Sequence, residues 1–396
     1  MSIKSTTRMS LGSVVVLTAL TSWADPTITD VIAQQRYPWN GKVDISYTVS
    51  GDIAAHCHEN GLINPTLKVS ATDMVADTVY TATATALDGD MALTDGTHTL
   101  VWDLDADGLS IQSSNVVFNV SCEVTEALYC VIDLSGGANA TNYPVAYLAT
   151  EPSEGFNVDA YKTTKLVLRR LAAGSFIMGD NQADETHRVT LTKPFYMGLF
   201  EVTQKQWSLV MGSNPCSSTS YGKGDTYPVH YVSYNMIRGS SSGAGWPESS
   251  AVDATSFLGK LQAKTGLNVD LPTEAQWEYA CRAGTATTYY WGNSMDGNYA
   301  WYSSNSGSKA HPAGGKTPNA WGLYDMTGNV WEWCLDWYGS LAYGMDPKGS
   351  SSGSGRVLRG GSWYVSESYC TSSYRGSNTP SYTSHNDGFR LSRTLP

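Results

Sequence analysis

The segment between Trp363 and Gly388 has the composition of a binding surface. Of its 24 residues, 14 are Ser, Thr or Tyr. Tyrosine offers a large and rigid contact area, and serine offers adaptable hydrogen bonds, so both are typical of loops that bind partners. The sequence therefore predicts a ligand-binding loop. The side chains expected to make its contacts are Tyr364, Ser366, Ser368, Tyr369, Tyr374, Asn378, Tyr382, His385 and Asn386.

The same segment contains a thiol, Cys370, which follows Tyr369 and lies eight positions after Ser362. A thiolate is a nucleophile and a ligand for soft metals. The chain has seven cysteines. Because that number is odd, at least one must stay unpaired, bind a metal or pair with another molecule.

The first 24 residues have the features of a secretory leader. Lys4 and Arg8 give a positive start, residues 11–20 are largely apolar, and Ser22-Trp23-Ala24 fits a cleavage site. We predict a cleaved signal peptide and an exported chain, which is periplasmic, secreted or held at the cell surface of a bacterium. The alternative is an uncleaved N-terminal anchor.

The net charge limits the classes of partner that the chain is expected to bind. The formal charge is −11, and the basic residues form no cluster. These features argue against nucleic acid and anionic membranes as partners. No later run has the roughly 20 apolar residues that a membrane-spanning helix needs. We expect an extracellular protein or a glycan as ligand, and no integral membrane segment.

Residues 25–150 predict an all-β sandwich of immunoglobulin-like type, followed by a linker at residues 151–161. Turn signals such as Asn60-Gly61 separate short runs with a period of two, the clearest of which is Val43, Ile45, Tyr47 and Val49. From the places of Cys57 and Cys122 in this region we predict a disulfide between the sheets.

Residues 162–396 form the second predicted domain, in which regular periodicity is sparse. Two helices are expected. One spans residues 251–265, and the other begins after Thr273, which has Gln276 as its capping-box partner.

Six motifs in this domain resemble, in order, those of the formylglycine-generating-enzyme family, also called sulfatase-modifying factors. The resemblance implies a C-type-lectin-like α+β fold whose cleft is formed by the C-terminal loop. The motifs are residues 174–179 (GSFIMG), 190–203 (TLTKPFYMGLFEVT), 228–233 (PVHYVS), 271–280 (LPTEAQWEYA), 321–333 (WGLYDMTGNVWEW) and the pair 359–363 (RGGSW) with 388–390 (GFR).

The resemblance also implies a structural calcium ion at the fifth motif. Carried over by position, its ligands are the side chains of Asp325 and Glu332 with the carbonyl oxygens of Gly328 and Val330. Calcium is a hard cation that prefers such oxygen ligands. The alternative is that Asp325 caps a turn and Glu332 makes a local ion pair.

Active members of the family oxidise a substrate cysteine with two thiols that hold copper(I). By position, Cys370 matches the second thiol, whereas Val365 stands where the first is expected. Because valine cannot bind copper, we expect neither copper nor oxidase activity. The alternative is a divergent oxidoreductase acting on protein cysteine, with Cys370 assisted by Tyr369 and Ser362.

The Tyr and Ser bias also resembles the variable region of diversity-generating-retroelement target proteins, many of which use this fold for display. Mutation of the adenines in an Asn codon produces largely these residue types. A loop of fixed sequence is the alternative. The preferred interpretation is an exported ligand-binding or display protein without catalytic activity.

Overall fold

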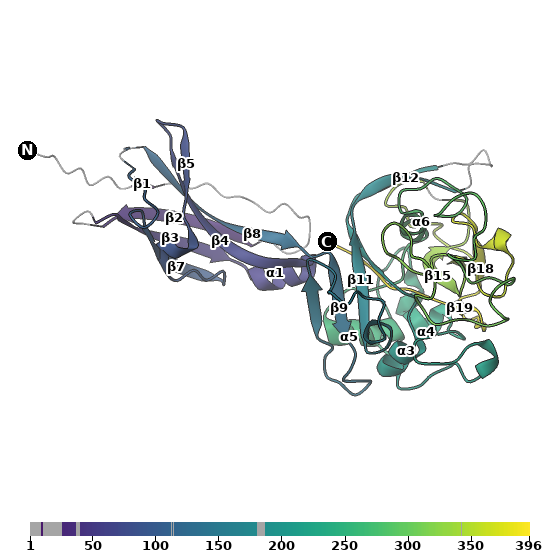
Figure 1. Ribbon diagram of the computed structural model, residues 1–396. Helices are drawn as coiled ribbons and strands as arrows, with labels where there is room; N and C mark the ends of the chain where they lie inside the picture. The colour runs from purple at the N-terminus through teal and green to yellow at the C-terminus, as the bar shows by residue number, and fades with distance from the viewer. Residues whose placement is uncertain are drawn as a thin grey trace, which may run out of the picture. The chain divides into compact units, whose positions relative to one another are not determined.

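The computed structural model describes residues 9–10, 26–36, 40–111, 113, 115–179, 187–341 and 343–396 (Figure 1). The predicted leader lies outside the described residues except for Met9 and Ser10. Two compact units divide between Ala127 and Leu128. No helix within the described ranges has the length and apolar character to cross a membrane.

The N-terminal unit consists of two antiparallel sheets around one hydrophobic core. Trp102 and Phe118, from different sheets, meet edge to face at a ring distance of 6.2 Å. The shared core is the sandwich that the alternating pattern predicts. The first sheet contains, in strand order, β1 (Met9–Ser10), β2 (Thr27–Gln35), β3 (Lys42–Ser50), β7 (Gly96–Asp103) and β6 (Leu87–Gly89). The second contains β5 (Thr78–Thr81), β4 (Leu62–Asp73) and β8 (Val116–Glu126).

One helix, α1 (Ile53–Asn60), interrupts this unit and corrects two expectations. Gly61 ends the helix with a left-handed φ of 62°, so Asn60-Gly61 is a helix cap and not a hairpin turn. Cys57 lies on the helix and Cys122 on β8, and both thiols are free. The predicted disulfide between the two sheets is therefore wrong.

The boundary between the units lies earlier than the sequence suggested. Strands β9 (Tyr129–Asp133) and β10 (Val145–Leu148) pair within the main sheet of the C-terminal unit. Phe156 and Tyr161, in the expected linker, are buried in that unit's core. Placing the boundary at residue 150 was wrong because these strands lack a clear break from the preceding ones.

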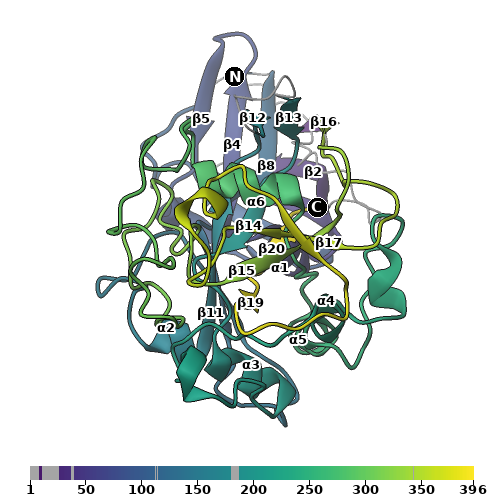
Figure 2. The ribbon, with the colours of Figure 1, turned by 90° about the vertical axis from the view of Figure 1, so that its right-hand side faces the viewer.

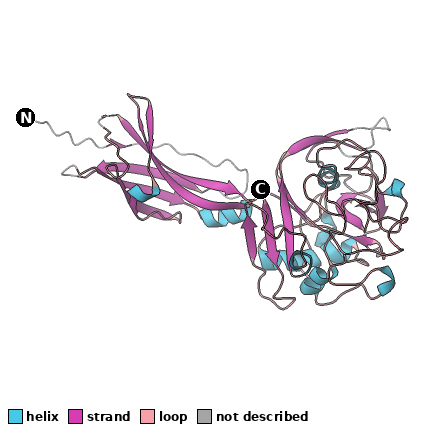
Figure 3. Ribbon diagram, in the orientation of Figure 1, coloured by secondary structure: helices cyan, strands magenta, loops and turns pink. Residues whose placement is uncertain are grey.

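The C-terminal unit joins three small sheets with long loops (Figures 2 and 3). The main antiparallel sheet adds β11 (Lys165–Leu171), β14 (Phe195–Gly198) and β20 (Ser392–Thr394) to β9 and β10. The second contains β12 (Gly174–Met178), β13 (His187–Leu191) and β16 (Gly344–Met345). The third contains β18 (Gly376–Asn378), β17 (Arg356–Arg359), β15 (Trp331–Trp337) and β19 (Asp387–Gly388).

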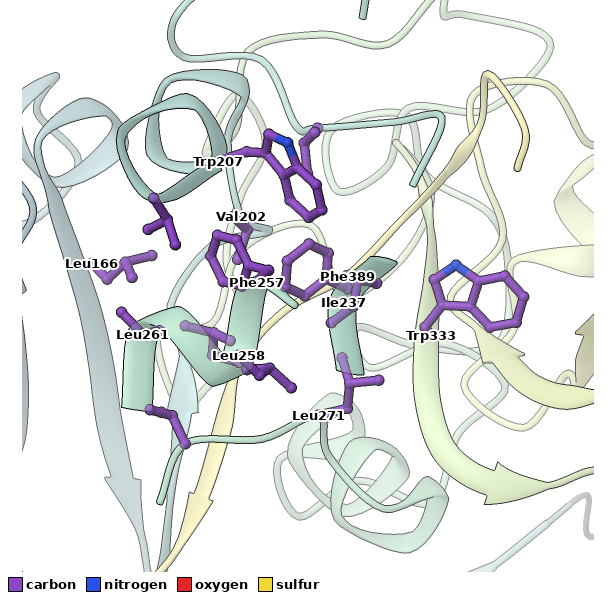
Figure 4. Packing of buried hydrophobic residues seen from close by; sticks show 14 of the residues in the cluster. Leu166, Val202, Trp207, Ile237, Phe257, Leu258, Leu261, Leu271, Trp333 and Phe389 are labelled. Atoms are coloured by element: carbon purple, nitrogen blue, oxygen red, sulfur yellow. The ribbon is translucent and has the colours of Figure 1, made fainter. Parts of the chain in front are cut away.

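Short helices cover these sheets, and their aromatic side chains fill the core. Trp207 stacks on Phe257 at 5.1 Å, and Phe389 meets both rings edge on (Figure 4). Large aromatic side chains bury enough area to order a unit with few regular elements. The helices are α2 (Ala160–Thr163), α3 (Gln204–Met211), α4 (Tyr234–Arg238), α5 (Phe257–Thr265) and α6 (Glu274–Arg282).

The two expected helices are present, one of them shorter. The capping box of α6 is confirmed, with Thr273 and Gln276 bonded reciprocally. Helix α5 begins at Phe257 instead of residue 251, because Ser256 caps it by accepting the amide of Gly259.

Candidate functional site

Buried ion pairs fix both ends of the C-terminal loop, the segment between Trp363 and Gly388. Arg390 donates to both oxygens of Glu332, at 2.6 and 2.7 Å, and both side chains are fully buried. Arg359, on the other side of the loop, pairs with Glu278. Its guanidinium also donates to three loop carbonyls, those of Ser372, Ser373 and Tyr374. Such charge-assisted bonds are strong and directional, so the loop has a rigid base.

The middle of the loop faces solvent. Tyr364 is 61% exposed, Tyr382 45% and Tyr369 42%, and the hydroxyls of Ser366 and Ser368 lie on the same surface stretch, 3.0 Å apart. Tyr374, Asn378 and His385 are half-buried. Eight of the nine expected contact residues are therefore at least partly accessible to a ligand.

Asn386 is the ninth residue, and its place differs from the expectation. Its amide donates to the hydroxyl of Ser362 at 3.1 Å, and its carbonyl accepts from Ser384 at 2.6 Å. Both Asn386 and Ser362 are buried. In this conformation they hold the two arms of the loop together and contact no solvent-borne ligand.

An aromatic cluster forms beside the loop around His385. The His385 ring lies 4.5 Å from Tyr221 and 5.2 Å from both Trp363 and Tyr364. Burial lowers the pKa of His385, which favours the neutral imidazole. The cluster therefore offers a ligand an uncharged aromatic wall next to the loop hydroxyls.

Cys370 lies beneath the loop surface and is fully buried. Burial raises the pKa of its thiol to about 12, so the reactive thiolate is disfavoured at neutral pH. Its sulfur lies 3.7 Å from the carbonyl of Ser366, and Gly361 packs directly against it. Val365, at the other expected thiol position, packs against the hydrophobic core.

Three buried carboxylates gather behind the loop, and one of them was not expected. Glu201 accepts the amide of Val330 at 3.0 Å and the side chain of Asn329 at 2.7 Å. Burial, followed by repulsion from Asp325 and Glu332, raises the pKa of Glu201 well above its usual range. Burial likewise raises the pKa of Asp325 to about 6. Of the three carboxyl groups, only that of Glu332 is bonded to Arg390.

The profile of the Sulfatase-modifying factor enzyme 1-like domain matches residues 159–395. The chain belongs to this family. The formylglycine-generating enzyme of Streptomyces coelicolor is 31% identical over 274 residues, which cover 56% of this chain and 87% of that protein. The mouse formylglycine-generating enzyme is 30% identical over 280 residues, or 57% of this chain and 74% of its own.

Among solved structures, Treponema denticola variable protein 1 is 32% identical, with a TM-score of 0.49. The match covers 59% of this chain and 96% of that one. The small sheets and short helices of the structure itself confirm the predicted α+β class.

The predicted calcium position offers one buried carboxylate oxygen without a partner. Asp325 accepts the amide of Gly314 at 2.6 Å through one oxygen, while its other oxygen is buried without a partner. Gly328 has a φ of 79° and Asn329 one of 56°, which folds this loop back on itself. Glu332 makes an ion pair, as in the alternative interpretation, but with Arg390, which is distant in sequence and not local. Glu332 also accepts the indole N–H of Trp277 at 2.6 Å. Within the described residues no three acidic, histidine or cysteine side chains form a ligand group, so carbonyl oxygens would complete any coordination.

Glu201 and Tyr221 are the residues that the sequence did not single out. A signal existed for Glu201, since it is an acidic residue inside the apolar run at residues 195–202. An unpaired acid in such a run indicates a buried charge with a partner. Tyr221 ends a short 3-10 helix (Thr219–Tyr221) far from residue 363 in sequence, and no local pattern pointed to it.

Proposed function

We propose that this chain is an exported binding protein of the family, which presents its C-terminal loop to an extracellular protein or glycan and does not oxidise cysteine. The observation that carries the proposal is the exposure of the loop's tyrosines and serines above a single buried thiol. Copper(I) is held by soft thiolates, and the position of the first one is occupied by Val365. The loop has the composition and exposure of a contact surface, and lacks the composition of an oxidase site.

A copper experiment tests the catalytic half of the proposal. The wild-type chain is titrated with copper(I) against a competing chelator, and a cysteine-containing peptide is followed by mass spectrometry for conversion to the aldehyde. We expect neither tight copper binding nor conversion. The variant Val365→Cys, which restores the thiol pair, should gain copper affinity, whereas Val365→Ser should not. Conversion by the wild-type chain that disappears in Cys370→Ser would establish the divergent oxidoreductase instead.

A binding screen tests the other half. The chain is applied to a glycan array and to a panel of purified bacterial surface proteins, together with the double variant Tyr364→Ala, Tyr382→Ala. The matched control is Tyr343→Ala, which removes a tyrosine that is 72% exposed outside the loop. We expect binding that the loop variant loses and the control keeps. Equal binding by both variants would contradict a role for the loop.

We further propose that the loop is diversified between cells. The eight accessible residues among the expected contacts are Tyr, Ser, Asn or His, which adenine mutation of an Asn codon can give, whereas the exposed Glu367 is not such a product. The eight residues lie on a buried frame, formed by Arg359, Arg390 and the carboxylates bonded to them, that need not change. Resequencing the end of the gene across a source population tests this proposal. Substitutions confined to adenine-derived positions between Trp363 and Gly388 would support it, and an invariant segment would overturn it while leaving a binder of fixed specificity.

A further inference from the structure

A cavity of about 820 Å³ opens on the C-terminal unit, and its lining includes no residue of the segment 364–387. The volume falls within the range of roughly 300–1,000 Å³ that is typical of small-molecule sites. The cavity lies between the start of α6, the end of β20 and the segment that carries Trp246. It is therefore a second candidate site, independent of the loop.

Part of the lining of this cavity is apolar. Leu271, Leu335 and Leu395 line it and are buried. Trp246 is half-buried, and its indole N–H donates to the carbonyl of Lys348 at 3.1 Å, which fixes the orientation of the ring. A fixed, flat aromatic ring beside polar groups suits a ligand that has one apolar face and a polar perimeter.

A buried hydroxyl lines the cavity without a partner. Ser392 is 1% exposed, and its hydroxyl oxygen makes no hydrogen bond in the described structure. Its backbone N–H and carbonyl are both bonded to Asp270, at 2.7 and 2.8 Å. An unsatisfied buried hydroxyl is unfavourable, so this group is suited to a ligand hydroxyl. The exposed amide of Asn268 lines the same cavity.

The charge at the rim is positive, although the whole chain is acidic. Lys193 and Lys348 are exposed there, and within the described residues neither forms a salt bridge. Of the two lining carboxylates, Asp270 is neutralised by Arg238 through two bonds of 2.8 Å. Only Asp346 opposes the two ammonium groups. The rim therefore favours an anionic substituent on the ligand.

We propose that this cavity binds an acidic oligosaccharide. A sugar ring places its apolar face against Trp246, its hydroxyls bond to Ser392 and Asn268, and a carboxylate lies near Lys193 and Lys348. The combination of an aromatic ring, an unsatisfied buried hydroxyl and two ammonium groups that have no carboxylate partner carries the inference. One of these groups, Lys348 Nζ, lies 5.5 Å from the centroid of the Trp246 ring.

Calorimetric titration of the full chain with trigalacturonate tests the proposal, with galactotriose as the neutral probe of equal length. We expect saturable binding at one site per chain, and about tenfold weaker binding of galactotriose, because a lost charge-assisted contact is worth about 1.4 kcal/mol. The double variant Lys193→Gln, Lys348→Gln should lose a similar factor. Lys260→Gln, on the neighbouring helix but outside the cavity, is the control. Equal affinity for the two sugars, or no saturation, would overturn the proposal.

Ser392→Ala separates binding from folding. Removing an unsatisfied hydroxyl leaves the stability unchanged or raises it, so the variant should fold. Its affinity for trigalacturonate should fall about 3- to 10-fold, the value of one hydrogen bond. Undiminished affinity in Ser392→Ala would contradict the site. The variant Tyr364→Ala, Tyr382→Ala should bind trigalacturonate normally, and a loss there would place the sugar at the loop and refute the cavity.

Discussion

The ends and the middle of the C-terminal loop hold their polar side chains in opposite ways. At the ends, Arg359 and Arg390 are fully buried and bonded to buried carboxylates. Arg359 also donates to carbonyls of the loop, and Arg390 to that of Gly198. Between the ends, Tyr364, Tyr369 and Tyr382 are exposed and make no bond to a buried charge. Stability therefore depends on the ends and recognition on the middle. This separation lets one frame carry many loop sequences.

Arg390→Met should have the largest effect on the free energy of unfolding, because it removes the ion pair that fixes one end of the loop. The variant leaves Glu332 buried without its partner, and breaking such a pair from one side costs about 3–5 kcal/mol. Urea denaturation followed by tryptophan fluorescence measures the loss. Arg188→Met, which removes an exposed arginine from β13, should change the free energy of unfolding by less than ~0.5 kcal/mol. Similar values for the two variants would show that the ion pairs do not hold the frame.

Calcium should stabilise the frame through the carboxylates that Arg390 leaves unneutralised. At a hundredfold excess over its Kd, a bound ion adds about 2–3 kcal/mol. The effect should be larger at pH 8 than at pH 5, because the cation needs the ionised carboxyl and the pKa of Asp325 is raised to about 6. Melting curves with calcium and with chelator measure it.

Two variants locate the calcium effect. Asp325→Ala should abolish it. Asp336→Asn should keep the calcium effect. Asp336 also has a buried oxygen without a partner, but it lies on β15, where it accepts the amide of Glu274 at the start of α6. A calcium shift that survives Asp325→Ala would exclude the predicted ligand set.

Asp387 is the last residue of the loop, and its carboxyl group is buried next to the fixed end. Burial raises the pKa of this carboxyl to about 7, from an ordinary value of 3.8. Its charged form therefore destabilises the fold as pH rises from about 4 to 7, and the penalty is complete above 7. Asp387→Asn should raise the stability at pH 8 by ~1–2 kcal/mol, since each pKa unit is worth about 1.4 kcal/mol and the buried amide offsets part of the gain.

The pH profile decides whether this interpretation of Asp387 holds. The advantage of Asp387→Asn over the wild-type chain should shrink as pH falls and vanish near pH 4. Asp225→Asn, at an exposed carboxylate, is the comparison. A constant difference between Asp387→Asn and the wild-type chain across this range would show that titration of Asp387 is not its cause.

Much of this frame was predictable from the sequence, because its motifs are local. The capping box at Thr273 and the exposed loop tyrosines follow from short patterns that need no distant partner. What failed depended on tertiary contacts. Helix α1 removed Cys57 from the sheet, β9 and β10 crossed the expected boundary, and Asn386 turned inward to Ser362. Glu201 and Tyr221 reach the site from segments distant in sequence, and a local sequence pattern cannot predict such tertiary contacts.

Replacing the loop tyrosines by alanine should have the smallest effect on the free energy of unfolding. Tyr382→Ala removes an exposed side chain, so the free energy of unfolding should change by less than ~0.5 kcal/mol. Tyr364→Ala and Tyr369→Ala should each cost slightly more. The Tyr364 ring meets those of Trp363 and His385 at 5.3 and 5.2 Å, and the Tyr369 ring meets that of Tyr374 at 4.9 Å. Denaturation curves of the same preparations used for binding provide the measurement. Binding lost at unchanged stability means that the middle of the loop serves recognition alone, whereas a large loss of stability would mean that these tyrosines belong to the frame.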